Sequence, residues 1–156
     1  MAIEAVKEYF SKFGIADKVQ EFDVSSATVE LAAEALSCEP ARIAKTLSFD
    51  LAGETILVVT AGDMRIAGPK FKAEFHSKPK MLEVSEVEQR IGHAVGGVCP
   101  FALKEGVKVY LDVSMKRFST IFPACGSSNS AIELTIPELE KYSSFESWVD
   151  VCKPIQ

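Results

Sequence analysis

The sequence predicts an α+β fold in which helices surround a compact, mixed and largely antiparallel β-sheet. Two helical patterns come first, and strands alternate with short helices after them. The connections between the strand patterns are too short for repeated β-α-β crossovers, so we expect no doubly wound parallel sheet. A length of 156 residues with 47% hydrophobic content predicts a single domain over residues 1–156.

The expected helices begin and end at recognisable residues. Residues 3–13 carry apolar side chains at spacings of three and four, and Gly14 follows them. Thr28 is a candidate N-cap for a second helix, and Pro40 suits the first position of a short helical turn. Residues 68–75 predict another short helix.

Two further helices are indicated by capping boxes, in which Ser or Thr precedes Glu by three residues. One box pairs Ser85 with Glu88, and the other pairs Thr135 with Glu138. The tail over residues 145–152 is interpreted as a last amphipathic helical turn.

The expected strands are short apolar runs. Two of them flank Ala52 and Gly53, which predicts a β-hairpin with a short loop. In the run that contains Asp112 and Ser114, polar and apolar residues alternate, so both polar side chains can face one side of a strand. The predicted strands cover residues 46–51, 54–61, 108–113, 118–124 and 130–135.

Composition excludes several classes of protein. No apolar run approaches the length of a membrane span, and the N-terminus carries acids and lacks the pattern of a signal peptide, so we expect a cytoplasmic protein. No two cysteines form a CxxC pair, which argues against a zinc site, and we expect free thiols. We expect no metal and no cofactor. The cysteines are Cys38, Cys99, Cys125 and Cys152.

Charge is distributed unevenly along the chain. The formal net charge is -5, which argues against a non-specific nucleic-acid binder. Residues 65–80 nevertheless hold five bases and one acid. Such a segment can contact phosphate groups, although an ordinary solvated surface would have the same composition. Its candidate contacts are Arg65, Lys70, Lys72 and Lys78.

Lys45 lies between two apolar stretches, at the start of a predicted strand. A lysine in this position either extends its ammonium group to the surface or is held in a cleft. A partly desolvated ammonium group is well suited to orient a carbonyl or phosphate oxygen. Both interpretations remain open from the residues alone.

The segment from Ile91 to Leu103 is apolar but contains Gly96, Gly97, Cys99 and Pro100. Adjacent glycines allow unusual backbone angles and the close approach of a ligand, and the N–H groups that follow can point at an oxyanion. A tight turn between two elements would explain the same residues. Cys99 is a conceivable nucleophile, but no base is assured beside it, and buried structural cysteines are common.

Few other residues suggest chemistry. The small polar residues between 122 and 132, which include Gly126 and Ser127, predict either a hairpin turn or the rim of a substrate site. His76 and His93 are the only histidines, and lone histidines are more often structural than catalytic. The common catalytic motifs, including the nucleophile elbow and the P-loop, are absent.

Taken together, five segments resemble the YbaK/ProX family of aminoacyl-tRNA deacylases, which is related to the editing domain inserted in bacterial prolyl-tRNA synthetases. The resemblance extends from about Thr28 to Tyr142, and its most specific features are Lys45 before a strand and the Gly-x-x-x-Pro loop from Gly96 to Pro100. The segments are RIAKTLSF, AGDMRI, VGGVCPFAL, VYLDVSMKRF and ACGSSNSAIEL.

The resemblance implies a barrel-like mixed sheet and a hydrolase that removes a small wrong amino acid, such as Cys or Ala, from tRNA-Pro. The implied partners are the 3′ end of an aminoacyl-tRNA and prolyl-tRNA synthetase, with no membrane. The catalytic residues would be Lys45 and Gly96, and the tRNA contacts would be Arg65, Lys70, Lys72 and Lys78. The substrate-binding residues would be Thr46, Ile66, Gly97, Val98, Cys99, Pro100, Asp112, Ser114, Gly126 and Ser127.

Because the sequence offers no obvious Ser-His or Cys-His nucleophile, we expect a water or a group of the substrate to attack the ester. Two other classes stay open: a tRNA- or synthetase-binding module without activity, and a hydrolase of small-molecule esters. Charge reversal in the basic segment of residues 65–80 tests the small-molecule hydrolase, because a small ester does not need phosphate contacts and its hydrolysis would be unchanged.

Overall fold

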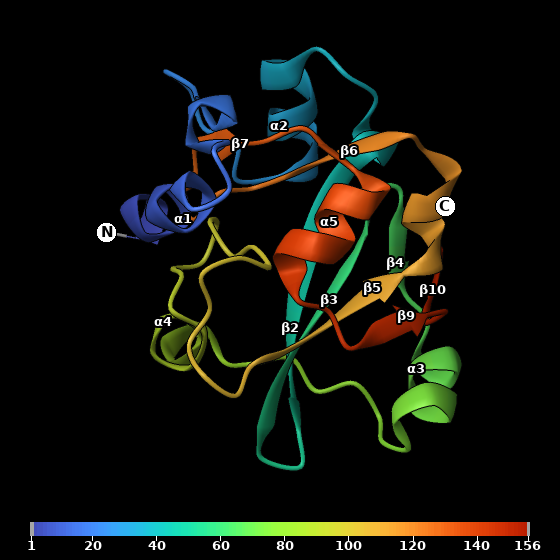
Figure 1. The fold of residues 1–156 in the computed structure, drawn as a ribbon. Helices are drawn as coiled ribbons and strands as arrows, with labels where there is room; N and C mark the ends of the chain where they lie inside the picture. Colours follow the sequence, from blue (N-terminus) through green and yellow to red (C-terminus); the bar gives the residue numbers. More distant parts are fainter. Residues whose placement is uncertain (1, 156) are drawn as a thin grey trace.

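The computed structural model describes residues 2–155, and a mixed six-stranded sheet forms its centre (Figure 1). The strand order is β8-β6-β2-β3-β5-β9, and the sheet curls into a half-barrel. Two smaller sheets pair β1 with β7 and β4 with β10. The strands are β1 (Gln20–Glu21), β2 (Ile43–Leu51), β3 (Glu54–Ala61), β4 (Met64–Ile66), β5 (Lys108–Asp112), β6 (Thr120–Pro123), β7 (Ser130–Ala131), β8 (Leu134–Thr135), β9 (Ser147–Val149) and β10 (Cys152–Pro154).

The predicted hairpin is confirmed and consists of β2 and β3. Its closing pair is Leu51 with Glu54. Ala52 has φ 52° and Gly53 has φ 90°, and two positive φ values in a two-residue loop are typical of a tight hairpin turn. The N–H of Gly53 donates to the Asp50 carboxylate at 2.9 Å, which holds the turn closed.

The predicted mixed sheet with surrounding helices is also confirmed. Strands β2 and β3 are antiparallel, as are β6 and β8. Strand β3 pairs in parallel with β5, β5 with β9, and β2 with β6. The long segments between β3 and β5 and between β5 and β9 cross over the sheet, and they carry helices that cover it.

Most of the predicted helix starts are correct. Thr28 caps its helix by accepting a hydrogen bond from Leu31 N–H, and Thr135 with Glu138 forms a complete capping box. The Ser85–Glu88 box is wrong, because the helix already begins at Val84 and Ser85 lies inside it. The α-helices are α1 (Ala2–Ser11), α2 (Val29–Leu36), α3 (Gly68–Phe75), α4 (Val84–Ile91) and α5 (Ile136–Ser143), and the 3-10 helices are η1 (Ala16–Lys18), η2 (Pro40–Arg42) and η3 (Val113–Arg117).

Two other local predictions are wrong. The tail over residues 145–152 is extended, because β9 pairs in parallel with β5 and β10 pairs with β4. Ser114 does not continue the strand of Asp112 but lies in η3, whose first turn the Asp112 carboxylate caps by accepting from Ser114 N–H. Tertiary pairing and a side-chain cap therefore overrule the local pattern in both places.

The two faces of the sheet are covered by different elements. Alternate residues of β2 and β3, including Ala44 and Val59, pack against α1, α4 and α5. The opposite residues, including Phe49 and Val58, pack against α3, β9 and β10. In Figure 1, α3 accordingly lies well apart from α1 and α4. Within residues 2–155, no helix is both long and apolar enough to cross a membrane.

Candidate functional site

A cavity of about 360 Å³ opens beside β2. Its other walls come from the start of α2, α4 and the residues just before it, the glycine loop from Gly96 to Pro100, the end of β6, and β7, so segments far apart in the chain meet there. Most of the lining is apolar. The lining residues are Ser26, Ala27, Thr28, Val29, Ala32, Ile43, Ala44, Lys45, Thr46, Leu47, Ser48, Met81, Leu82, Val84, Val87, Val95, Gly96, Val98, Phe122, Ala124, Ser130 and Ala131.

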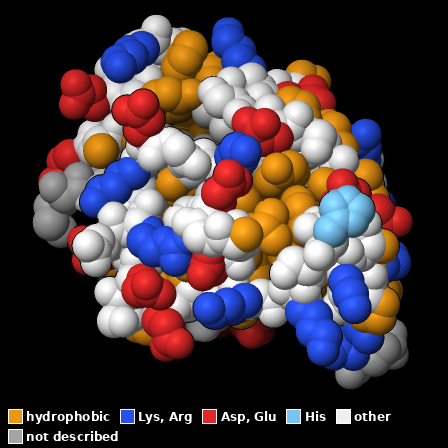
Figure 2. Space-filling view, turned by 90° about the horizontal axis from the view of Figure 1, so that it is seen from below, with side chains coloured by type: hydrophobic (Ala, Val, Ile, Leu, Met, Phe, Trp, Pro, Cys, Tyr) orange, Lys and Arg blue, Asp and Glu red, His pale blue; other side chains and the backbone are white. Residues whose placement is uncertain are grey.

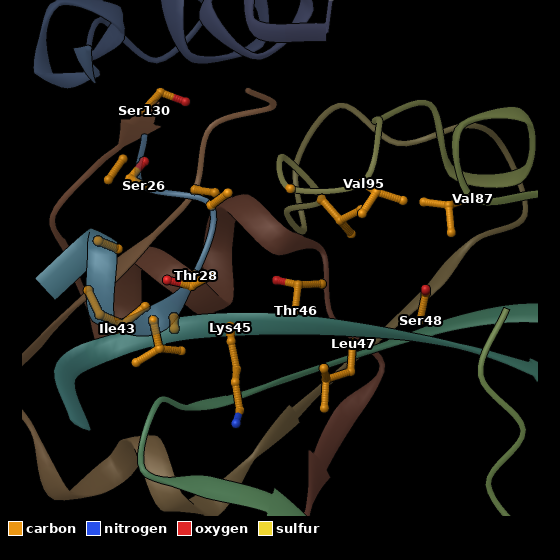
Figure 3. A pocket seen from close by; sticks show the side chains of 18 of the residues that line it. Ser26, Thr28, Ile43, Lys45, Thr46, Leu47, Ser48, Val87, Val95 and Ser130 are labelled. Atoms are coloured by element: carbon orange, nitrogen blue, oxygen red, sulfur yellow. The ribbon is translucent and has the colours of Figure 1, made fainter. Parts of the chain in front are cut away.

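Strand alternation divides the β2 residues that border this cavity. Figure 3 shows Thr46 and Ser48 directed toward Val95 and Val87, while Lys45 points to the other side of the strand. The Thr46 hydroxyl is buried and has no hydrogen-bond partner within residues 2–155. An unpartnered buried hydroxyl is costly, so its presence in the cavity wall favours a ligand that pairs with it.

Lys45 is half-buried, and within residues 2–155 its ammonium group forms no hydrogen bond and no ion pair. Burial lowers its pKa, and the carboxylates of Glu30 and Asp63 oppose that shift. The ammonium group thus lies on the opposite side of β2 from the glycine loop (Figure 3). Its predicted catalytic role stays a prediction.

The glycine loop borders the cavity through Gly96 and Val98. Gly96 has φ 93°, a conformation that L side chains rarely adopt. Gly97 instead packs on the loop within residues 122–132, called the second loop below, where an added Cβ would lie 2.7 Å from the Gly126 carbonyl carbon and from Ser127 N. The two glycines therefore have different functions: one shapes the cavity wall and the other lets two loops touch.

The second loop contributes to the cavity through different residues from those predicted. Ala124, Ser130 and Ala131 border the cavity, whereas Gly126 and Ser127 do not. The Ser127 hydroxyl lies 2.7 Å from that of Ser130 and holds the loop together. Substrate contacts of Gly126 and Ser127 stay predictions.

Cys99 is not among the lining residues and is fully buried, with Sγ 3.5 Å from His93 Nε2, so the structure places a histidine beside it. Burial raises the pKa of this thiol to about 12. His93 Nε2 donates to the Phe101 carbonyl at 2.6 Å, and burial lowers the pKa of the imidazole. A buried thiol that stays protonated at neutral pH is a poor nucleophile, so this pair is suited to packing rather than covalent catalysis.

Four other predicted substrate contacts lie away from the cavity lining. The Asp112 carboxylate accepts hydrogen bonds from Ser114 N–H and Val151 N–H, and the Ser114 hydroxyl lies 3.1 Å from that of Thr60. Ile66 pairs with Cys152 between β4 and β10. Pro100 borders a second, separate hollow. Substrate binding by these residues stays a prediction.

The predicted tRNA contacts Arg65, Lys70, Lys72 and Lys78 are all exposed. Lys70 is partly engaged, because its ammonium group lies 3.0 Å from the Asp150 carboxylate. Figure 2 shows Lys and Arg side chains gathered at one corner of the face seen from below, while acids and bases mix over the rest of it. Within residues 2–155, no three His, Cys, Asp or Glu side chains gather closely enough to hold a metal ion.

Comparison with known proteins assigns a family to this arrangement. The model of the aminoacyl-tRNA editing domain matches residues 23–142, a range that includes β2, the glycine loop and the second loop. The chain belongs to the aminoacyl-tRNA editing domain family. The resemblance seen in the sequence is thereby confirmed.

The relatives of this editing domain include a free-standing chain and part of a synthetase. It is 50% identical to the uncharacterized protein YwhH of Bacillus subtilis (strain 168) over 154 residues, which are 98% of each chain. It is 30% identical to the proline–tRNA ligase of Lysinibacillus sphaericus (strain C3-41) over 125 residues, which are 80% of this chain and 22% of the ligase.

A solved structure supports the fold of the editing domain. The crystal structure of a proposed trans-editing enzyme for prolyl tRNA synthetase matches it with a TM-score of 0.87 and 24% identity, over 97% of each chain. At this identity the likeness concerns the fold, and it confirms the predicted α+β architecture.

Sequence reasoning missed much of the editing domain's cavity wall. Ser48 could have been found, because it is a polar residue two positions after Thr46 in an otherwise apolar strand. Met81, Val84 and Val95 carry no such signal, since exposed apolar residues are common on any surface. Only the fold brings them to the mouth of one cavity.

Proposed function

We propose that this protein is a hydrolase that removes the amino acid from mischarged aminoacyl-tRNA. The observation that carries the proposal is the cavity beside β2, where Gly96 and the Thr46 hydroxyl, unpartnered within residues 2–155, border a mostly apolar space. A cavity of about 360 Å³ suits a small ligand group, and membership of the editing domain family supports an aminoacyl ester as that group.

The chemistry we propose is not covalent. The glycine loop would supply main-chain N–H groups near Gly96 and Val98 to the developing oxyanion, and removing one such donor typically costs about 2.7–4 kcal/mol of transition-state stabilisation. The attacking group would be a water, or a ribose hydroxyl or side-chain thiol of the substrate. Cys99 is unsuited to the attack because its thiol is buried and protonated.

We further propose that Lys45 provides positive charge to the substrate complex. Its ammonium group has no anionic partner at hydrogen-bond distance within residues 2–155, so an anionic oxygen of the bound tRNA on that side of β2 can pair with it without breaking an existing ion pair. The exposed Arg65, Lys70, Lys72 and Lys78 would contact the phosphates of the tRNA.

The substrate we favour is tRNA-Pro that carries a small wrong amino acid, such as Cys or Ala. A small apolar cavity supports a small side chain, and the likeness to a proline–tRNA ligase and to a proposed trans-editing enzyme supports tRNA-Pro. A synthetase pocket discriminates one methylene by only about 1–3 kcal/mol, so a separate hydrolytic site has a purpose. We also propose that the chain acts as one domain over residues 1–156, in the cytoplasm, with prolyl-tRNA synthetase as a partner.

The test is release of amino acid from a panel of charged tRNAs that includes Cys-, Ala-, Ser- and Pro-tRNA-Pro. We expect hydrolysis of at least one mischarged species above the spontaneous rate and little hydrolysis of Pro-tRNA-Pro. If the protein binds these tRNAs and hydrolyses none of them, it is instead a binding module. If it hydrolyses small amino acid esters as fast as the charged tRNAs, the tRNA is not its substrate.

A further inference from the structure

Strand β2 has an edge that is interrupted at the cavity. On the side away from β3, its ladder with β6 includes only Ile43 and Ala44. Further along, Asp50 N–H donates to Lys80 O at 2.8 Å, and Leu82 N–H donates to Ser48 O at 3.2 Å. Thr46 lies between these two stretches, at the point where the cavity touches the strand.

The main chain of Thr46 faces this interruption. Successive residues of a strand direct their N–H and C=O groups to alternate edges, and Ser48 and Asp50 direct theirs away from β3. Thr46 lies two residues before Ser48, so its N–H and C=O also point away from β3, whereas those of Lys45 and Leu47 point toward β3, opposite Thr60 and Val58. Within residues 2–155, neither β6 nor the 80–82 segment bonds to the main chain of Thr46. Both of its hydrogen-bonding groups are therefore available to a ligand.

The side chain of Thr46 independently indicates a ligand at this place. Its Oγ1 is buried and without a partner in the described residues, and Figure 3 shows the side chain directed into the cavity. Three polar groups of one residue, the N–H, the C=O and the hydroxyl, are thus without a partner in the described residues at the place where β2 borders the cavity. Unpaired groups of this kind are rare in folded proteins unless something binds them.

We propose that Thr46 binds the α-amino-acid part of the substrate as one residue of an antiparallel strand pair. The Thr46 N–H donates to the carbonyl oxygen of the ester, and the α-ammonium group of the substrate donates to the Thr46 C=O. Two residues that face each other in this way exchange both hydrogen bonds. The inference rests on the proposed function and deepens it, because it assigns the groups that recognise an α-amino ester.

This pairing also determines where the substrate side chain goes. Paired residues of a sheet direct their side chains to the same face, so the substrate side chain enters the cavity beside Thr46 Oγ1. The surrounding Leu82, Val87 and Val98 are apolar and leave room for a small group. A β-hydroxyl or β-thiol would pair with Oγ1, as cross-strand Thr and Ser hydroxyls do.

Amide hydrogen exchange of the labelled full chain tests the pairing directly. The ligand is 3′-(L-alanylamino)-3′-deoxyadenosine, an amide analogue of the aminoacyl end that cannot be hydrolysed as an ester. In the free protein we expect the Thr46 amide to exchange faster than the amides of Lys45 and Leu47, which by strand alternation point toward β3. With the analogue bound, we expect exchange at Thr46 to slow at least about tenfold and exchange at Lys45 to change little.

A second measurement needs neither the analogue nor a variant. The substrate is an aminoacyl-tRNA that the protein hydrolyses. Acetylation of its α-amino group removes the positive charge, and kcat/KM is measured with the free and the acetylated substrate. We expect acetylation to lower kcat/KM at least about tenfold, because it removes a charge-assisted hydrogen bond.

Thr46→Val, which keeps the shape and removes the hydroxyl, should lower the preference for Ser- or Cys-tRNA over Ala-tRNA.

Three results would overturn the proposal. The first is a Thr46 amide that is already protected in the free protein. The second is a Thr46 amide that stays unprotected although chemical-shift changes at Gly96 and Val98 show that the analogue is bound. The third is equally fast hydrolysis of the acetylated and the free substrate. Failure of the proposed function looks different, because then no charged tRNA is hydrolysed, whatever the Thr46 amide does.

Discussion

Lys45 and Thr46 are neighbours in the chain, but their side chains leave β2 on opposite sides (Figure 3). Thr46 faces the cavity with the glycine loop, and Lys45 shares the other face of the sheet with Thr60, its cross-strand partner in β3. One strand therefore offers a hydroxyl and main-chain groups to the cavity and an unpaired ammonium group to the opposite side. The following predictions separate these contributions.

The first prediction concerns Lys45. Lys45→Met keeps the apolar stem and removes the charge, so we expect kcat/KM for a mischarged tRNA to fall by about a hundredfold. The melting temperature should stay the same or rise, because an unpaired half-buried ammonium group contributes nothing to stability. Lys12→Met, at an exposed site, is the control. A fall in kcat/KM that is accompanied by a lower melting temperature would mean that Lys45 has a structural role instead.

The second prediction concerns the basic segment. We expect weaker tRNA binding from each of three charge reversals, Arg65→Glu, Lys72→Glu and Lys78→Glu. The slope of log affinity against log salt concentration should become less steep by about one for each phosphate group that the variant no longer neutralises. Lys70→Glu is less informative, because it also removes the ion pair with Asp150. Binding is measured at several salt concentrations, with Lys18→Glu as the control. An unchanged salt slope in all three variants would exclude this segment from tRNA binding.

The third prediction compares the two glycines. Gly97→Ala forces a Cβ to 2.7 Å from the second loop, so it should lower the free energy of unfolding by more than Gly96→Ala. Gly96→Ala has room for a Cβ but strains a positive φ, which costs on the order of 1–3 kcal/mol. Denaturant unfolding measures both. The opposite order of stability would contradict the close packing of the two loops.

The fourth prediction concerns Cys99. Because its thiol is fully buried and its pKa is raised to about 12, Cys99→Ala should keep most of the hydrolytic activity and lose some stability. Initial rates and unfolding are measured together, and mass spectrometry of the wild type looks for an acyl-enzyme. A trapped acyl-enzyme at Cys99 would replace the non-covalent mechanism with a covalent one.

The fifth prediction concerns pH and His93. Burial lowers the pKa of His93 below its ordinary 6.5, so the unfolded chain binds a proton more readily than the folded one. The contribution of His93 to stability is therefore complete above that ordinary value and is lost as pH falls toward the lowered pKa. We expect His93→Gln to flatten the decline in unfolding free energy between about pH 7 and 5. If the unfolding free energy of His93→Gln falls as steeply with decreasing pH as that of the wild type, protonation of carboxylates and not of His93 causes the decline.

Local patterns predicted the elements whose signals are local. The β2–β3 hairpin follows from two apolar runs around Ala52–Gly53, and the caps at Thr28 and Thr135 follow from single side chains that bond to nearby N–H groups. The tail was predicted wrongly because β9 and β10 are strands only through their pairing with β5 and β4. A short segment takes its conformation from its partners more than from its own residues.

The sequence by itself determined the family and the mixed sheet with its helices, because these depend on the order of motifs and on short spacings, and it singled out Lys45, Thr46 and Gly96 as candidate site residues. Only the tertiary structure decided which predicted residues share a cavity, that Lys45 points away from it, and that the edge of β2 is unpaired at Thr46. The physical reason is that strand pairing brings together segments far apart in the chain, and alternation along each strand then sends neighbouring side chains to opposite faces.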